Sequence, residues 1–305
     1  MREPGERVWA APGDERRSAG AVCVLGAPRS GTSLTARILN ILGVHLGSGE
    51  ELMEPAGGNN PAGFWEHEGI ADLNEDILAT LGDAPRQRWR YPPPLEDGWE
   101  HDPRLEPHRQ AARSMLERSF AGRPLWGWKD PRTCLTLPFW REALAQTAQV
   151  EARMRYAICV RHPLDVAASL EARDGMSHEE SVRLWLRYTW QAVVQTSGQP
   201  RAFVSYEGYF PSWEDQAARL ARFLGLADLA GAQRSAIEAH LDEDLWHHRD
   251  GGRGTDRRAE EAGLPPDAAD LYALLSELCD AQTEPRRDAE SRLDATAHRV
   301  AELLA

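Results

Sequence analysis

The stretch AVCVLGAPRSGTSLTARILNILG, residues 21–43, decides the fold class of this chain. Residues 21–26 form a short apolar run that ends in glycine, which is the pattern of a buried parallel strand. Residues 33–43 carry apolar side chains at helical spacing before a closing glycine: Leu34, Ile38, Leu39, Ile41 and Leu42. The order of strand, glycine-rich loop and helix predicts the beginning of an α/β fold.

The same order recurs along the chain. Residues 154–173 join a continuous apolar strand, MRYAICV, to a helix with proline in its first turn. Residues 124–129 and 201–206 predict two further strands, and residues 213–226 predict a helix after the second of them. This alternation predicts a P-loop-like three-layer α/β fold with a central parallel sheet flanked by helices. The ligand site is then expected at the carboxyl ends of the strands.

The remaining segments suggest how the chain is organised. Residues 1–20 are aperiodic and rich in Pro, Gly, Glu and Arg, so we expect a flexible tail before a single domain of residues 21–305. Residues 82–108 are rich in Pro, Trp and charge, which is typical of an insertion that shapes a substrate pocket. Apolar periodicity from about residue 265 onward predicts two C-terminal helices.

Composition limits the partners and the compartment. The chain has 35 basic and 48 acidic residues, a net charge of −13, so its surface repels nucleic acid and anionic lipid. It lacks the run of about 18 apolar residues that a membrane span needs, and its charged start is unlike a signal peptide. The four cysteines are widely spaced, which favours reduced packing residues over a metal site. We therefore expect a cytoplasmic protein.

The loop between the first strand and helix has the glycine spacing of a phosphate-binding loop, from Gly26 to Gly31. Thr32 occupies the position at which nucleotide hydrolases need lysine, so the cation here is Arg29. Backbone N–H groups and the helix N-terminus attract anions at such a loop, and nearby hydroxyl groups add donors. A simple tight turn between strand and helix is the alternative interpretation.

Two motifs resemble those of sulfotransferases that use 3′-phosphoadenosine 5′-phosphosulfate (PAPS). PRSGTS, residues 28–33, resembles the 5′-phosphosulfate loop of the branch with arginine in that loop, which includes tyrosylprotein and bacterial carbohydrate enzymes. RHPLDVAASL, residues 161–170, resembles the 3′-phosphate motif, in which Arg161 and Ser169 hold the phosphate. Ser169 lies about two helical turns after Arg161 and returns to the same side. A surface arginine after a strand is the plainer alternative for Arg161.

The resemblance covers roughly residues 21–255 and implies a PAPS co-substrate and no metal. It implies that the loop HHRDGGRGTDRR, residues 247–258, closes over the nucleotide, although the sequence departs here from the family pattern. A solvated basic loop is the alternative, with Arg249 a further contact if the loop closes. The residues expected to bind the nucleotide are Pro28, Arg29, Ser30, Gly31, Thr32, Ser33, Arg161, Ser169 and Arg253.

Only one of the 35 basic residues is a lysine, Lys129, in the motif WGWKDPRT. A chain so biased to arginine keeps a lysine by chance or where a compact charge is needed. The Lys-Asp-Pro motif resembles that of the tyrosylprotein branch, which implies that Lys129 assists transfer at the bridging oxygen of the donor. Asp130 is then expected to be an orienting partner, and Arg132 to contact the donor or the substrate. A surface pair of Lys129 and Asp130 is the alternative.

Transfer to an alcohol also needs a general base. The segment NPAGFWEHEG, residues 60–69, presents Glu66 and His67 ahead of a helix, and we favour Glu66 as the base. The earlier GSGEELMEP contains Glu51, the rival, beside Glu50. Solvated loop acids are the alternative for each of these carboxylates.

The sequence thus predicts a sulfotransferase that moves a sulfuryl group from PAPS to a hydroxyl or amine of a small-molecule or carbohydrate acceptor. Trp89, Tyr91 and Trp99 in the 82–108 insertion favour a ring-bearing or sugar-like small molecule as the acceptor. A kinase-like phosphotransferase with an unusual P-loop and a non-catalytic nucleotide-binding protein are the alternatives.

Overall fold

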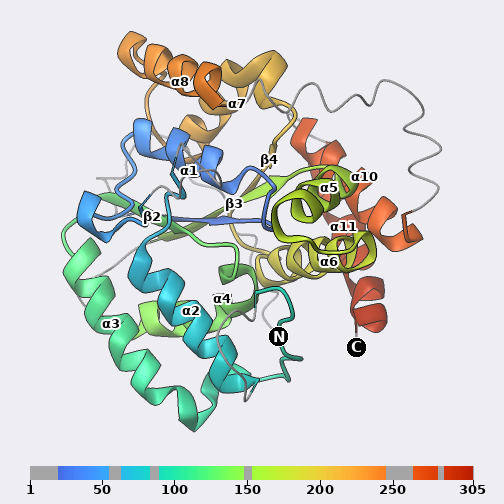
Figure 1. The fold of residues 1–305 in the computed structure, drawn as a ribbon. Coiled ribbons are helices and arrows are strands. Elements are labelled where there is room, and N and C mark those ends of the chain that lie inside the picture. Colours follow the sequence, from blue (N-terminus) through green and yellow to red (C-terminus); the bar gives the residue numbers. More distant parts are fainter. Residues whose placement is uncertain are drawn as a thin grey trace, which may run out of the picture.

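The computed structural model describes residues 20–54, 63–82, 89–147, 153–244, 264–280 and 285–304. Its centre is a sheet of four parallel strands in the order β2-β1-β3-β4, which confirms the predicted α/β fold with a parallel sheet (Figure 1). The strands are β1 (Gly20–Leu25), β2 (Leu125–Lys129), β3 (Arg153–Val160) and β4 (Arg201–Ser205). Their carboxyl ends meet at one edge, because all pairings are parallel.

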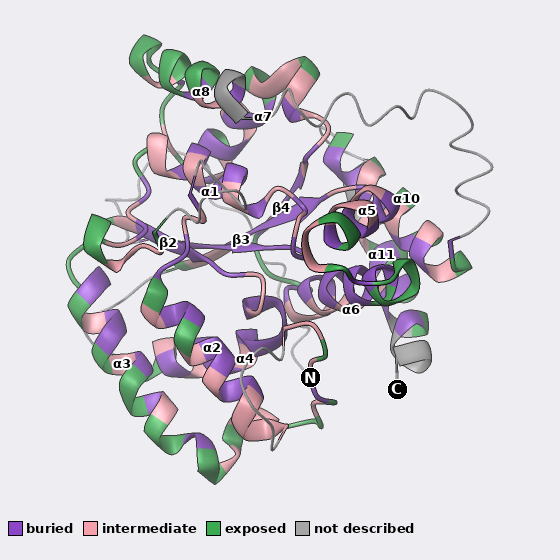
Figure 2. Cartoon of the chain, viewed as in Figure 1, coloured by how far each residue is buried: buried purple, intermediate pink, exposed green. Residues whose placement is uncertain are grey.

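Side chains of β1 alternate between the two faces of the sheet. Ala21, Cys23 and Leu25 belong to one hydrophobic cluster, and Val22 and Val24 to the other. Every residue of β1 is buried, and the sheet is purple throughout its centre in Figure 2. Burial on both faces explains why the strand reads as a continuous apolar run.

Helices cover both faces and complete three layers. The smaller cluster lies under α1 (Thr32–Ile41), α7 (Tyr209–Phe223) and α8 (Gly231–Asp244). The larger cluster is covered by α2 (Glu68–Leu81), α3 (Glu106–Phe120), α4 (Thr133–Ala145), α5 (Pro163–Asp174), α6 (His178–Gln195), α10 (Pro266–Asp280) and α11 (Pro285–Leu304).

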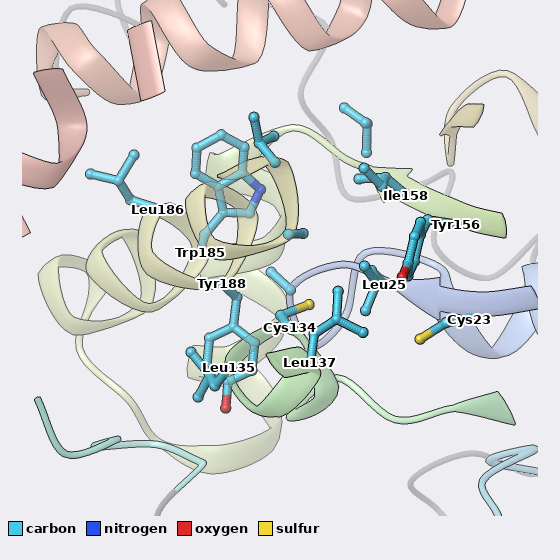
Figure 3. Packing of buried hydrophobic residues seen from close by; sticks show 14 of the residues in the cluster. Cys23, Leu25, Cys134, Leu135, Leu137, Tyr156, Ile158, Trp185, Leu186 and Tyr188 are labelled. Atoms are coloured by element: carbon cyan, nitrogen blue, oxygen red, sulfur yellow. The ribbon is translucent and has the colours of Figure 1, made fainter. Parts of the chain in front are cut away.

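The larger cluster is rich in aromatic rings. Trp126 stacks on Phe120 with ring centroids 4.4 Å apart, and Trp128 continues the stack at 5.7 Å from Trp126. Cys23 and Cys134 lie among the apolar side chains drawn in Figure 3. All four cysteines are free and buried, and burial raises the pKa of Cys134 to about 12. They are therefore packing residues, as predicted.

The described part of the 82–108 insertion is fastened to α5 and α6. The hydroxyl of Tyr188 donates to the carbonyl of Trp89 (2.8 Å), and Arg90 forms a salt bridge with Asp174 (3.0 Å). The short helices η2 (Trp99–His101) and η3 (Pro103–Leu105) follow. Residues 83–88 of the insertion and the predicted tail up to residue 19 lie outside the described residues.

Among the described residues, no helix is both long and apolar enough to cross a bilayer.

Candidate active site

The loop between β1 and α1 turns sharply because three of its residues adopt positive φ: Gly26 (145°), Arg29 (70°) and Gly31 (82°). A Cβ atom on Gly26 would lie 2.9 Å from the carbonyl oxygen of Cys159, and one on Gly31 would lie 2.5 Å from the Tyr206 ring. Both glycines therefore allow a close approach to the ends of β3 and β4 as well as the turn itself.

The two sequence motifs meet at this loop. The Nε atom of Arg29 donates to the hydroxyl of Ser169 on α5 (2.9 Å). Arg161, directly after β3, donates from a terminal nitrogen to the carbonyl oxygen of Arg29 (2.8 Å). The structure thus brings Arg29, Arg161 and Ser169 together from positions far apart in the sequence.

This part of the edge concentrates positive charge. Burial lowers the pKa of Arg29, and repulsion from Arg173 and Arg161 lowers it further. Among the described residues, the hydroxyl of Ser30 and the Nε atom of Arg161 are buried without a hydrogen-bond partner. Buried polar atoms without partners are costly, so a bound anion that accepts from them would stabilise the site.

Tyr206, directly after β4, is a candidate site residue that the sequence analysis missed. Its backbone N–H donates to the carbonyl of Val160 (2.8 Å), and the guanidinium of Arg161 lies 4.3 Å from the centre of its ring. Burial raises the pKa of Tyr206, so it stays neutral. Its position at the end of a parallel strand was the signal that could have identified it.

Lys129 ends β2 beside the same loop, and its side chain is 3% exposed. Its ammonium group donates to the hydroxyl of Ser33 (3.2 Å), to the carbonyl oxygen of Phe64 (3.3 Å) and to the carboxylate of Glu66. An ammonium has three N–H donors, so the protein itself engages all three. The predicted base and the predicted lysine therefore form a buried ion pair.

Arg132 forms the outer part of this network. It donates to Asp130 (2.8 Å) and to Glu75 on α2 (2.9 Å), and lies 3.5 Å from the second oxygen of Glu66. Burial by itself lowers the pKa of Arg132, but attraction to Asp130, Glu66 and Glu75 more than offsets it and raises the pKa above its usual value. Asp130 thus orients Arg132, and Arg132 is held by carboxylates of the protein.

Glu51 and His67 lie together, and both contact Ser119 on α3 rather than Lys129. Ser119, near the end of α3, donates to Glu51 (2.6 Å) and lies 3.2 Å from the Nε2 atom of His67. Burial raises the pKa of Glu51, but hydrogen bonds from Ser119 and Ser48 and the nearby His67 lower it overall to about 2. Burial lowers the pKa of His67.

The other predicted site residues are placed as follows. Thr32 begins α1 and is buried, whereas Glu50 in η1 (Gly49–Glu51) is exposed. Arg253 and the rest of residues 247–258 lie outside the described residues. Within the described ranges, no group of three or more His, Cys, Asp and Glu side chains is arranged to hold a metal ion.

Comparisons with known proteins give matches only among solved structures. A scan against protein-family models finds no match, and no curated protein sequence matches. The sulfotransferase domain from the curacin biosynthetic pathway is 16% identical, with a TM-score of 0.41 over 70% of this chain and 76% of that chain. The sulfotransferase domain from the Synechococcus PCC 7002 olefin synthase is 18% identical, with a TM-score of 0.40 over 97% and 98%.

A third similar structure is retinol dehydratase in complex with androsterone and the inactive cofactor PAP. It is 15% identical, with a TM-score of 0.36 over 93% of this chain and 80% of that chain. At such low identities and TM-scores, the function of this chain rests on its own residues.

Proposed function

We propose that this chain is a PAPS-dependent sulfotransferase, which transfers a sulfuryl group from PAPS to a hydroxyl or amine of a small-molecule or carbohydrate acceptor. The observation that carries the proposal is the meeting of two phosphate motifs at one edge of the sheet. Arg161 contacts the backbone of Arg29, and the side chain of Arg29 contacts Ser169. A donor with phosphates at two positions of its ribose fits such a paired site.

The chain's own groups suit this donor. The loop of residues 28–33 would hold the 5′-phosphosulfate, with the buried Ser30 hydroxyl as a donor that has no partner among the described residues. Arg161 and Ser169 would hold the 3′-phosphate. Ser169 accepts a hydrogen bond from Arg29, so its own hydroxyl proton is left to donate to a phosphate oxygen.

The transfer itself assigns separate roles to Glu66 and Lys129. Glu66 accepts the proton of the acceptor hydroxyl as the new S–O bond forms. The bond between sulfur and the bridging oxygen breaks, and 3′-phosphoadenosine 5′-phosphate (PAP) leaves with that electron pair. Lys129 stabilises the charge on the bridging oxygen. Such a base contributes roughly 10²- to 10⁴-fold to a rate, and preorganised positive charge a comparable amount.

The pairing of Lys129 with Glu66 ties these two roles together. Since the ammonium already makes three hydrogen bonds, a contact with the donor must replace one of them. When the donor takes the place of Glu66 at the ammonium of Lys129, the Glu66 carboxylate becomes free to accept from the acceptor hydroxyl. Arg132 lies 3.5 Å from this carboxylate and stays as its counter-charge. In this proposal the donor binds first and its binding releases the base.

Two broader features belong to the same proposal. We place the enzyme in the cytoplasm, where its free buried cysteines would remain reduced. The alternative of a kinase-like phosphotransferase is disfavoured by Thr32, which cannot supply the charge that a hydrolase or kinase loop takes from lysine.

Transfer of radiolabelled sulfate from PAPS to a panel of sugars, phenols, alcohols and amines tests the proposal. We expect a labelled product and an equal amount of PAP from the wild-type protein without added metal. Phosphate transfer from Mg·ATP, with no sulfate transfer to any compound, would overturn it.

A further inference from the structure

A chain of hydrogen bonds runs beside the proposed base without including it. Ser119 donates to Glu51 Oε1 over 2.6 Å, and His67 Nε2 lies 3.2 Å from the same hydroxyl oxygen and 3.6 Å from Glu51 Oε1. The three residues come from η1, α3 and the N-cap of α2. These hydrogen bonds therefore join three elements next to Glu66, because His67 follows it directly in the sequence.

The protons available on these three side chains fix which group donates in each hydrogen bond. A carboxylate only accepts, so the single proton of the Ser119 hydroxyl goes to Glu51. The hydroxyl oxygen can then only accept from His67, which requires a proton on Nε2 and leaves Nδ1 bare. The structure thus assigns the Nε2–H tautomer to His67.

The imidazole of His67 is also enclosed by its neighbours. It is 3% exposed, and its ring centre lies 5.7 Å from that of Phe120. A Cβ atom on Gly47 would lie 3.0 Å from the ring, and one on Gly69 would lie 3.4 Å from it. The ring therefore has little room to move while Ser119 holds it.

The backbone transmits this restraint to Glu66. The carbonyl oxygen of Glu66 accepts from the N–H of Met53 (2.9 Å), and His67 forms a β-bridge with Leu52. Trp65 on the other side has a φ of 55°, unusual for a residue with a side chain. Glu66 and His67 are adjacent, yet one faces Lys129 and the other faces Ser119.

We propose that Ser119 is a positioning residue of the enzyme, and that the brace Glu51–Ser119–His67 holds Glu66 in the place where it meets Lys129 and the acceptor. Glu51 and His67 then belong to the brace and are not themselves the base. This inference rests on the proposed function, because Glu66 matters as a base only in that account.

Ser119→Ala is the central test, with Ser114→Ala on the exposed side of the same helix as its control. Misplacement of a reacting group by about 1 Å can cost roughly 100-fold in rate. We expect kcat to fall at least about 10-fold in Ser119→Ala while the Kd for PAP changes less than about twofold. Ser119→Thr keeps the hydroxyl and should recover most of the loss. A kcat equal to that of Ser114→Ala would overturn the proposal.

Glu51→Gln separates a brace from a base. An amide oxygen can still accept one hydrogen bond at this position, so we expect kcat to fall less than about 10-fold. Replacing a general base instead costs roughly 10²- to 10⁴-fold. A loss in that range for Glu51→Gln, with Glu66→Gln still active, would make Glu51 the base and overturn the brace.

A measurement without substrate keeps this test apart from the proposed function. Nitrogen NMR of the imidazole, assigned with His67→Gln, should show the Nε2–H tautomer at neutral pH. Amide hydrogen exchange of residues 63–67 should be at least about 10-fold faster in Ser119→Ala than in Ser114→Ala. The Nδ1–H tautomer, or equal exchange in the two variants, would refute the brace even if the protein transferred no sulfate.

Discussion

Lys129 forms a buried ion pair with Glu66, a residue 63 positions earlier in the chain. Their side chains are 3% and 9% exposed, so water does little to compensate either charge. Removing one partner of a buried pair leaves the other charge uncompensated. This pair joins the end of β2 to the segment before α2.

Glu66→Gln should lower kcat by roughly 10²- to 10⁴-fold, because a neutral amide cannot take the acceptor's proton. The amide oxygen still accepts from Lys129, so the Kd for PAP should change little. Steady-state rates and titration with PAP measure both effects. The control is Glu68→Gln, an exposed residue two positions away. Turnover of Glu66→Gln within about threefold of that control would contradict the assignment.

Lys129→Met should lower kcat by roughly 10²- to 10³-fold and also destabilise the fold, by at most about 3–5 kcal/mol, because Glu66 is left buried with Arg132, 3.5 Å away, as its remaining cationic partner among the described residues. Adding Glu66→Gln to this variant should recover much of the stability and none of the activity. Urea unfolding and turnover of the two single variants and the double variant measure this. A double variant as unstable as Lys129→Met would show that the pair does not govern stability.

Gly31→Ala should weaken PAP binding at least about 10-fold and destabilise the protein more than Gly43→Ala does. Both glycines have positive φ, 82° and 102°, so each alanine carries a backbone cost of about 1–2 kcal/mol. Only at position 31 would the new Cβ meet the Tyr206 ring, at 2.5 Å, whereas Gly43 has open space. Equal unfolding free energies and equal PAP affinities for the two variants would contradict the close approach.

His67 should make the folded state less stable as the pH falls below about 6.5. Burial, with Arg118 adding to it, lowers the pKa of His67 from 6.5, while Glu51 opposes them. The unfolded chain then binds the proton first, so stability rises with pH in this window and is lost as the pH falls toward the folded-state pKa. The free energy of unfolding, measured with urea between pH 7.5 and 5.5, should change less steeply with pH in His67→Gln than in the wild type. An unchanged slope would contradict a buried neutral imidazole.

His45 also has a pKa lowered by burial and contributes in the same direction. His45→Gln is therefore the control. In this variant the part of the pH dependence of the unfolding free energy that comes from His67 should remain. The pKa of Glu51 is lowered to about 2, so its contribution is lost at more acid pH, between about 4.5 and 2.

Much of the fold followed from short apolar runs in the sequence. Residues 21–26 and 156–160 are buried on both faces of the sheet and therefore show no polar alternation, which made the two strands recognisable as parallel strands. Carboxyl ends of parallel strands share one edge, so residues directly after different strands could be expected to meet. That rule is enough to bring Arg29, Arg161 and Lys129 to one edge.

The directions of side chains in irregular segments did not follow from the sequence. Glu66 and His67 are adjacent candidates, and the sequence does not show that Glu66 faces Lys129 while His67 faces Ser119 on α3. Ser119 lies 52 residues from His67 on a helix with no motif, so nothing local marked it. The three carboxylates around Arg132 likewise come from the turn after β2, the segment before α2 and α2 itself, and the sequence shows no pairing between Arg132 and Glu75.

Calorimetric titration with PAP, with adenosine 5′-phosphate for comparison, tests the central claim most directly. The wild-type protein should bind PAP at least about 100-fold more tightly, and Arg161→Ala should reduce PAP to the affinity of adenosine 5′-phosphate. Arg153→Ala, at the exposed opposite end of β3, should behave as wild type. Equal and weak binding of the two nucleotides by the wild-type protein would contradict the account, because no group would then recognise the 3′-phosphate.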